Sequence, residues 1–296
     1  MLIIYDFTPR ITIFTDNITT LESLLIYAMK TITYQSDYLG NGFEFATINQ
    51  PDDYEGKVVA TVIRKQCSMP SNKAVLYVHG FNDYFFQSDM AHRFNEKEYH
   101  FYAIDLRKYG RSTLPHHKSN NMRSLTEYFA DLDEALEIIR QEGNEQVLLS
   151  GHSTGGLLVT LYASERVGNE KFDTIFCNSP FYDMNMPGYQ KRLLVPLVAL
   201  FGKYFPDVLL PGKISEWYGH SLHGEKKGEW DYNLVWKPHL VPALNAGWIS
   251  AIHQGHTKIK KGIILTRPIL VMHSHQSIYS KDWSATFFEG DAILNV

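Results

Sequence analysis

One hexapeptide, Gly-His-Ser-Thr-Gly-Gly at residues 151–156, constrains this chain more than any other feature. It follows an apolar run at residues 146–150 and opens a helix-like stretch at residues 157–168. A serine at the apex of a sharp strand-to-helix turn has a strained backbone, so the residues two positions away must be small, and both are glycine. The turn lifts the Ser153 hydroxyl clear of the sheet and places N–H groups at a helix N-terminus. The pattern and its flanks therefore favour a nucleophile elbow over a glycine-rich turn whose serine only caps a helix.

Length and composition fit one globular α/β domain with an insertion, because the 296 residues are 44% hydrophobic and 20% charged. The net charge is −4 with no long basic run, so we expect no nucleic-acid partner. No apolar run approaches the roughly 20 residues of a spanning helix, and the N-terminus lacks signal-peptide features. We expect a cytoplasmic protein without an integral membrane segment, whose Cys67 and Cys177 are reduced and buried.

Strand-like runs alternate with helix-like runs through most of the chain. We expect strands at residues 74–78, 102–104, 146–150, 174–177 and 268–272, and an antiparallel hairpin from residues 43–48 and 58–63. Ser124 and Glu127 form a capping box for the helix that leads to the elbow strand. The alternation predicts an α/β fold with a mostly parallel sheet, helices on both faces, and a ligand site beyond the carboxyl ends of the strands.

The pattern breaks at two places, which divides the chain into segments. We expect an N-terminal extension at residues 1–40, a first core part at 41–180, a helical cap insertion at 181–255 and a second core part at 256–296. The extension, with a helix at residues 20–32, is expected to pack on the outside of the core. The cap is expected to lie over the elbow. Its apolar stretch, residues 193–201, is interpreted as a buried cap helix, with a membrane-touching or acyl-binding segment as the alternative.

Four features together carry a family resemblance. They are the His79-Gly80 turn after a strand, the Asp105-x-Arg-x-x-Gly-x-Ser112 loop, the elbow and the late cap. Over residues 43–296 the chain resembles the α/β-hydrolase superfamily, closest to its monoacylglycerol lipase, lysophospholipase and serine aminopeptidase-like branch. The resemblance implies hydrolysis of a small-molecule acyl ester or lipid, without a metal or other cofactor.

The resemblance also implies roles for individual residues. Ser153 is the expected nucleophile, which attacks an ester carbonyl and becomes acylated. The backbone N–H groups of Phe81 and Thr154 are expected to form the oxyanion hole. The family places its acid in the loop after the strand at residues 268–272, where Asp291 fits an Asp-apolar-apolar setting and Asp282 is the second choice.

The catalytic histidine departs from the family pattern, because no histidine follows His275. The family places this residue after one more helix and one more strand. His273 or His275 is a substitute only in the weaker interpretation; ordinary strand-end histidines are favoured, and His152 and His79 are interpreted as packing residues. We therefore expect a chain truncated before its last strand, which leaves residues 268–272 as an exposed apolar edge.

Three functional interpretations remain at this point. The first is a serine hydrolase of the lysophospholipase or monoacylglycerol lipase type. The second is a serine aminopeptidase-like peptidase, but the cap acids Glu216, Glu225 and Glu229 are interspersed with lysines and form no clear anionic patch. The third is a catalytically inactive binding protein, for which the absent histidine argues. The histidine pairs at residues 116–117 and 253–256 lack the carboxylate or cysteine that would complete a metal site.

Overall fold

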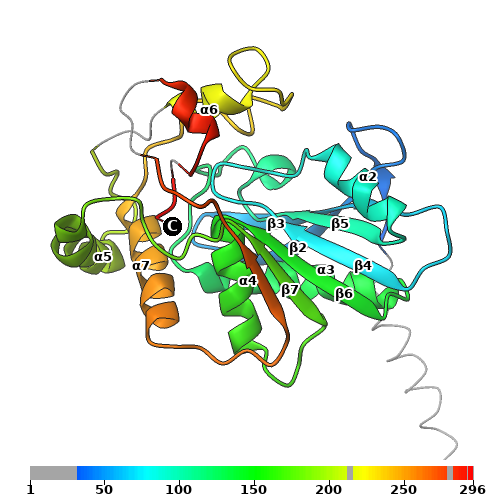
Figure 1. Ribbon diagram of the computed structural model, residues 1–296. Helices are drawn as coiled ribbons and strands as arrows, with labels where there is room; N and C mark the ends of the chain where they lie inside the picture. The colour runs from blue at the N-terminus through cyan, green and yellow to red at the C-terminus, as the bar shows by residue number, and fades with distance from the viewer. Residues whose placement is uncertain (1–31, 212–215, 279–282, 292, 296) are drawn as a thin grey trace, which may run out of the picture. The chain divides into compact units, whose positions relative to one another are not determined.

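The sheet of the computed structural model has the strand order β1-β2-β3-β5-β4-β6-β7-β8 (Figure 1). The structure describes residues 32–211, 216–278, 283–291 and 293–295. The strands are β1 Gln35–Ser36, β2 Glu44–Asp53, β3 Gly56–Lys65, β4 Lys73–Val78, β5 His100–Asp105, β6 Gln146–His152, β7 Thr174–Asn178 and β8 Ile269–Met272. Strands β1, β2, β3 and β5 pair antiparallel, and β5, β4, β6, β7 and β8 pair parallel. The predicted mostly parallel α/β sheet and its hairpin are confirmed.

Helices cover both faces of this sheet (Figure 1). They are α2 Ser88–Glu96, α3 Phe129–Gln141, α4 Thr154–Glu165, α5 Val195–Tyr204, α6 Glu216–Leu222 and α7 Ala246–Lys260, with short helical turns η2 Gly110–Ser112, η3 Leu125–Tyr128, η4 Gln190–Leu194 and η5 Ala285–Phe288. On one face Ala91 of α2 packs with Tyr77 and Phe101 of the sheet. Helices α3 and α4 lie on the other face. The predicted capping box of Ser124 and Glu127 is present and starts η3, which runs into α3.

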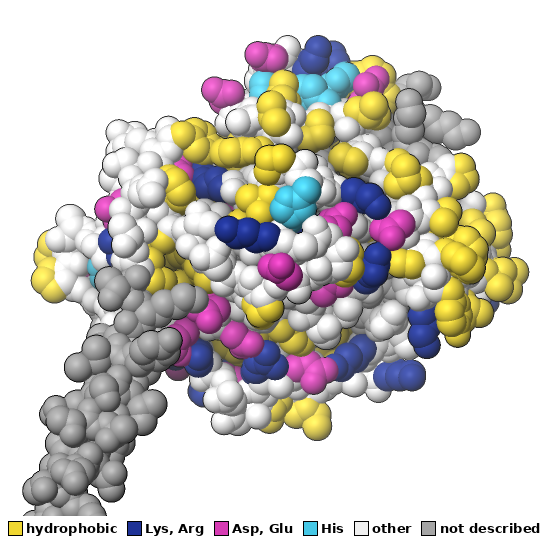
Figure 2. Space-filling model, turned by 180° about the vertical axis from the view of Figure 1, so that it is seen from behind, with side chains coloured by type: hydrophobic (Ala, Val, Ile, Leu, Met, Phe, Trp, Pro, Cys, Tyr) yellow, Lys and Arg dark blue, Asp and Glu magenta, His cyan; other side chains and the backbone are white. Residues whose placement is uncertain are grey.

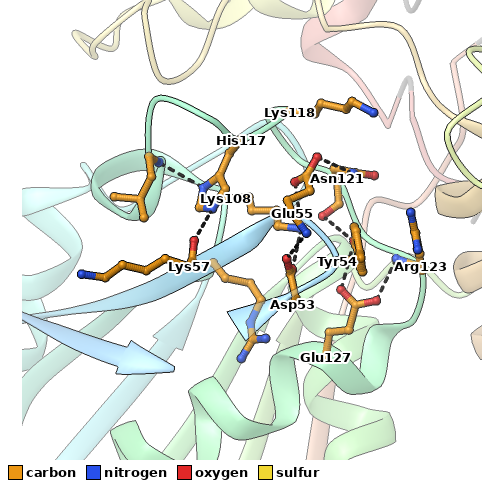
Figure 3. A network of polar contacts seen from close by, with 12 residues as sticks. Asp53, Tyr54, Glu55, Lys57, Lys108, His117, Lys118, Asn121, Arg123 and Glu127 are labelled. Atoms are coloured by element: carbon orange, nitrogen blue, oxygen red, sulfur yellow. Dashed lines mark hydrogen bonds and ion pairs between the residues drawn. The ribbon is translucent and has the colours of Figure 1, made fainter. Parts of the chain in front are cut away.

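The tip of the β2–β3 hairpin is fastened to the loop after β5 by a buried cation (Figure 3). The Lys108 side chain is fully buried, with its Nζ 2.6 Å from Asp53 Oδ2 and 2.9 Å from Glu55 Oε2. The Tyr54 ring lies beside the same ammonium group, 4.1 Å from it. Because a buried ammonium is stable only with such partners, the contact fixes this loop. The loop carries Tyr109, whose ring lies 4.9 Å from that of His79.

Helix α7 runs through position 255, at which the sequence suggested the boundary between cap and second core part. It begins at Asn245, whose Oδ1 accepts a hydrogen bond of 2.7 Å from the Trp248 N–H. At Gly255 an added Cβ would lie 2.8 Å from Leu125 Cδ1 and 3.1 Å from Leu161 Cδ1. The helix therefore starts in the cap region and continues along the core.

Residues 193–201 were expected to form a buried cap helix; the helix is present, but the expectation that it is buried is wrong. These residues belong to η4 and α5, so the helix forms. Leu193, Leu197 and Leu200 are nevertheless 67%, 66% and 59% exposed, whereas Val195 and Ala199 are buried. The run is apolar on all sides, but only one of its faces has a packing partner in the described structure.

Strand β8 is the outermost described strand on its side of the sheet, and Ile269, Leu270, Val271 and Met272 are all exposed. The expected apolar edge is thus observed. Cys67 and Cys177 are free and buried, as expected. The elements expected within residues 1–31, and Asp282, lie outside the described residues. No helix in the described ranges is both long and apolar enough to cross a membrane.

Candidate active site

Ser153 stands between β6 and α4 with φ 54° and ψ −119°, a strained conformation for a residue with a side chain. The two flanking glycines are required by close backbone approaches. A Cβ at Gly151 would lie 2.5 Å from the Gly155 carbonyl oxygen, and one at Gly155 would lie 2.4 Å from the Val78 carbonyl oxygen. The Ser153 N–H donates to the Asn178 carbonyl at 3.1 Å, which ties the turn to the end of β7. The predicted elbow geometry is confirmed.

A second tight turn follows β4 and lies directly against the elbow. A Cβ at Gly80 would lie 3.1 Å from Ser153 Cβ. The His79 ring is buried, and its Nε2 accepts from the Leu106 N–H at 3.1 Å. This assigns the proton to Nδ1, which donates to the Gly80 carbonyl at 2.7 Å. His79 therefore supports the turn from below, and both of its nitrogens are occupied.

The two turns open into a cavity of about 440 Å³. Ser153, Thr154, Phe81 and Asp291 all line it, so the structure brings the four expected site residues together. Much of the remaining wall is apolar and comes from the cap and α7: Phe181, Met184, Met186, Val241, Leu244, Trp248 and Ile249. A mostly apolar cavity with a few polar groups is typical of a small-molecule site.

Two backbone donors near Ser153 have no acceptor in the part of the chain that the structure describes. Thr154 is the first residue of α4, where the helix itself provides no acceptor for the N–H. Within the described ranges, the backbone hydrogen bonds use neither the Thr154 N–H nor the Phe81 N–H. Both residues contribute to the cavity wall.

Asp291 enters the cavity wall from the chain after β8. Its N–H donates to the Gln276 carbonyl at 3.0 Å, and its own carbonyl accepts from the Ile278 N–H at 2.7 Å. Its Oδ1 accepts from the N–H groups of Ile293 and Leu294 at 2.8 and 2.7 Å. The carboxylate is therefore held in a fixed direction by its own turn.

The profile of the family described as "Serine aminopeptidase, S33" matches residues 69–280, which is most of the chain and includes both turns. The chain belongs to this serine aminopeptidase family. Its fold is that of the α/β hydrolases. No curated protein matches its sequence.

Solved structures with the same fold are distant in sequence. A soluble variant of monoglyceride lipase from Saccharomyces cerevisiae, in complex with a substrate analog, is 17% identical, with a TM-score of 0.55 over 83% of this chain and 78% of that one. A monoacylglycerol lipase from Paleococcus ferrophilus is 20% identical, with a TM-score of 0.53 over 73% and 79% of the two chains. At these identities the likeness concerns the fold alone.

The histidines that line the cavity of this serine aminopeptidase family member are not the two at the end of β8. His273 is exposed and bonded to the Ser274 carbonyl, and neither it nor His275 is part of the cavity wall. His152, expected only to pack, does line the cavity, and burial lowers its pKa while Asp83 opposes that shift. His239 of the cap also lines it, and both of its ring nitrogens are buried without a partner among the described residues.

The sequence interpretation missed a buried ion pair in the cavity wall. Lys237 Nζ lies 2.8 Å from Asp83 Oδ1, with side-chain exposures of 9% and 4%. The neighbouring residues add a second link, because Asn82 Nδ2 donates to the Pro238 carbonyl at 3.1 Å. Asp83 follows the His-Gly turn closely, which was a usable signal. Nothing local marks Lys237, which reaches the site only through the fold of the cap.

Three of the seven described non-glycine residues with positive φ lie in the wall of this cavity. Besides Ser153, the non-glycine residues Asn82 and Ser179 have positive φ values of 49° and 46°, and all three line the cavity wall. Residues held in such conformations cost about 1–3 kcal/mol each and persist where the surrounding structure imposes them. The surroundings of Ser153 are therefore rigidly determined from three separate strand ends.

Proposed function

We propose that this protein is a serine hydrolase that cleaves carboxylic esters through an acyl-enzyme at Ser153. The observation that carries the proposal is the strained Ser153 in an apolar cavity whose wall also holds two backbone N–H groups that have no acceptor among the described residues. A serine raised on such a turn is suited to attack a bound carbonyl. Asp291, the residue that the family resemblance implies as the acid, lies in the same wall and is proposed for that role.

In the proposed reaction, Ser153 Oγ forms a bond to the ester carbonyl carbon. The negative charge that develops on the carbonyl oxygen is stabilised by the N–H groups of Phe81 and Thr154, each contributing about 3–4 kcal/mol. The alcohol then leaves with the proton that the serine lost, and water releases the acid by the same steps. The proton must pass through a base, and His152 and His239 are the histidines of the described cavity wall.

The acyl ester is proposed to be a lipid, of the monoacylglycerol or lysophospholipid kind. The apolar wall formed by the cap and α7 suits an acyl chain. Two proteins of similar fold are a monoglyceride lipase, in complex with a substrate analog, and a monoacylglycerol lipase. A peptidase that takes a free amino terminus would need an unpaired carboxylate for the ammonium group, but Asp83 is already paired with Lys237.

The test combines a covalent probe with a substrate series. The chain and a Ser153→Ala variant are treated with a fluorophosphonate probe and assayed on p-nitrophenyl esters of increasing chain length. We expect labelling at Ser153, and a loss of at least about a thousandfold in turnover on substitution. An unlabelled Ser153 in folded protein would contradict the proposal and favour the binding-protein alternative.

The base is tested separately, with His152→Ala and His239→Ala compared with His273→Ala and His275→Ala. Removing a general base costs about 10²–10⁴-fold. We expect this loss in kcat from one of the first two variants, and little change from the last two.

A further inference from the structure

The outward face of the cap helix forms an apolar patch, which we call the outer cap patch. Its members are Tyr189, Leu193, Leu194, Leu197, Leu200, Phe201, Tyr204, Phe205, Val208 and Leu209, all between 44% and 67% exposed. These are ten of the twenty-two exposed large hydrophobic side chains of the described residues, although the segment is only 21 residues long. Scattered exposed leucines are ordinary, but a contiguous patch marks an interaction surface.

The exposed apolar side chains of the patch recur at helical spacing, so they form one continuous face of the helix. Leu193, Leu197, Leu200 and Tyr204 recur at intervals of four, three and four residues, which places them on one side of the helix. The opposite side packs closely on α7, where a Cβ at Gly202 would lie 2.0 Å from the Ala246 carbonyl oxygen. The inner face is therefore already occupied, and the outer face has no partner among the described residues.

Charge around the patch differs from that of the whole chain. Residues 187–210 contain Lys191, Arg192, Lys203 and a single acid, Asp207, whereas the chain as a whole has a net charge of −4. Lys191 is paired with Asp183, just before this range, so Arg192 and Lys203 are the basic residues of the range that no acid pairs with among the described residues. Asp207 is paired with Lys118 and Arg123, which adds two more basic residues to the rim. Figure 2 shows hydrophobic side chains gathered on the side where Figure 1 places α5, with Lys and Arg side chains close by.

We propose that the outer cap patch docks on an anionic lipid bilayer surface. An apolar helix face with basic residues at its rim inserts into the boundary between head groups and acyl chains, and the basic groups are attracted to anionic lipid. A protein partner of ordinary polarity would not require so continuous an apolar stripe. The helix behind the patch, α7, supplies Trp248 and Ile249 to the cavity wall, so docking would bring that cavity close to the bilayer. The proposal does not depend on catalysis.

Docking is tested by sedimentation of the full chain with vesicles, and no p-nitrophenyl ester is present. Vesicles of phosphatidylcholine alone are compared with vesicles that contain three parts in ten of phosphatidylglycerol. We expect stronger binding to the anionic vesicles and weaker binding at high salt. Leu197→Gln with Leu200→Gln should reduce partitioning at least about tenfold, because two apolar side chains no longer enter the bilayer. The matched control is Val235→Gln with Ile264→Gln, which changes two side chains that are 86% and 74% exposed elsewhere and should bind as the parent does.

A single-site label separates the bilayer from other occupants of the patch. The native cysteines are buried, so a Leu197→Cys variant offers one accessible thiol for maleimide. We expect rapid labelling of the free protein that slows when anionic vesicles are added. Slow labelling at every protein concentration would show that the chain covers its own patch, and labelling that slows as protein concentration rises would show a second copy there. Either of these results, or equal binding of the double variant and parent, overturns the proposal.

Discussion

The elbow and the cap helix both contain apolar helical segments, but a sequence motif marks the elbow, whereas no motif shows which face of the cap helix is buried. At the elbow, Gly151 and Gly155 are needed because carbonyl oxygens lie within 2.5 Å of any Cβ there. At the cap, Leu197 is exposed and Ala199 buried although both belong to the same apolar run. At Gly151 the crowding comes from Gly155, four residues along the chain, whereas at Gly155 it comes from Val78 and His79 in the neighbouring turn. Both positions nevertheless fall inside one short sequence motif, so the requirement for glycine can be recognised from the sequence. Burial depends on which helix face meets a distant partner.

The buried pair of Asp83 and Lys237 joins the turn after β4, which lies against the elbow, to the cap segment between α6 and α7, and breaking this pair should have the largest effect. Lys237→Met leaves the Asp83 carboxylate buried without a partner, which costs about 3–5 kcal/mol of unfolding free energy. Denaturant unfolding of the variant measures this loss. If the pair is the cause, Lys237→Met combined with Asp83→Asn recovers most of the stability, whereas additive losses would mean that the two side chains act separately.

The elbow itself should tolerate no added methyl group. In Gly155→Ala the new Cβ would meet the Val78 and His79 carbonyl oxygens, each at 2.4 Å. Since backbone must move, we expect a loss of about 3 kcal/mol in unfolding free energy and the loss of fluorophosphonate labelling. Gly168→Ala is a useful control for crowding, because no atom lies within 4 Å of its Cβ position, although its φ of 81° adds modest strain. Equal stability of Gly155→Ala and the parent would contradict the steric argument.

The contrast between features with a sequence motif and features set by distant contacts explains which parts of the structure could be predicted from the sequence. The strands, the elbow and the capping box of Ser124 and Glu127 depend on local pattern, and all are observed. The gathering of Phe81, Thr154 and Asp291 around Ser153 was expected from family resemblance, and these residues do share one cavity. Lys237 was missed because its partner lies 154 positions away in the chain. Long-range contacts of this kind have no local signature.

Helix α7 lies between the two regions and carries His256, a buried histidine that should make the free energy of unfolding depend on pH. Its ring is buried, and its Nε2 bonds to the carbonyl of Phe181 at 2.7 Å, while the Phe181 N–H donates to the Ser153 carbonyl. Burial lowers the pKa of His256 from 6.5 to about 4. Between these values the unfolded chain binds a proton that the folded chain does not, so stability falls as pH drops from 6.5 to 4. The contribution amounts to about 3 kcal/mol over the window.

This pH dependence is measured by denaturant unfolding at intervals between pH 7 and 4. His256→Gln should flatten the slope in that window, whatever its effect on stability at pH 7. His275→Gln, which changes an exposed histidine three residues after the end of β8, is the matched control and should keep the parent slope. An unchanged slope in His256→Gln would assign the acid sensitivity to other groups.

The smallest expected effect lies on the outer face of α5 and sharpens the comparison most directly. Leu197→Ala removes more atoms than Val195→Ala, yet Leu197 is 66% exposed and Val195 only 8%. In a helix whose burial is set by its partner, the smaller truncation should cost more: about 1–2 kcal/mol for Val195→Ala from the lost burial. For Leu197→Ala we expect a change within about 0.5 kcal/mol, as for other surface substitutions. Thermal or denaturant unfolding without lipid measures both. A larger loss for Leu197→Ala would mean that the outer face is already packed in the free protein, and that the difference between the two faces of α5 is not real.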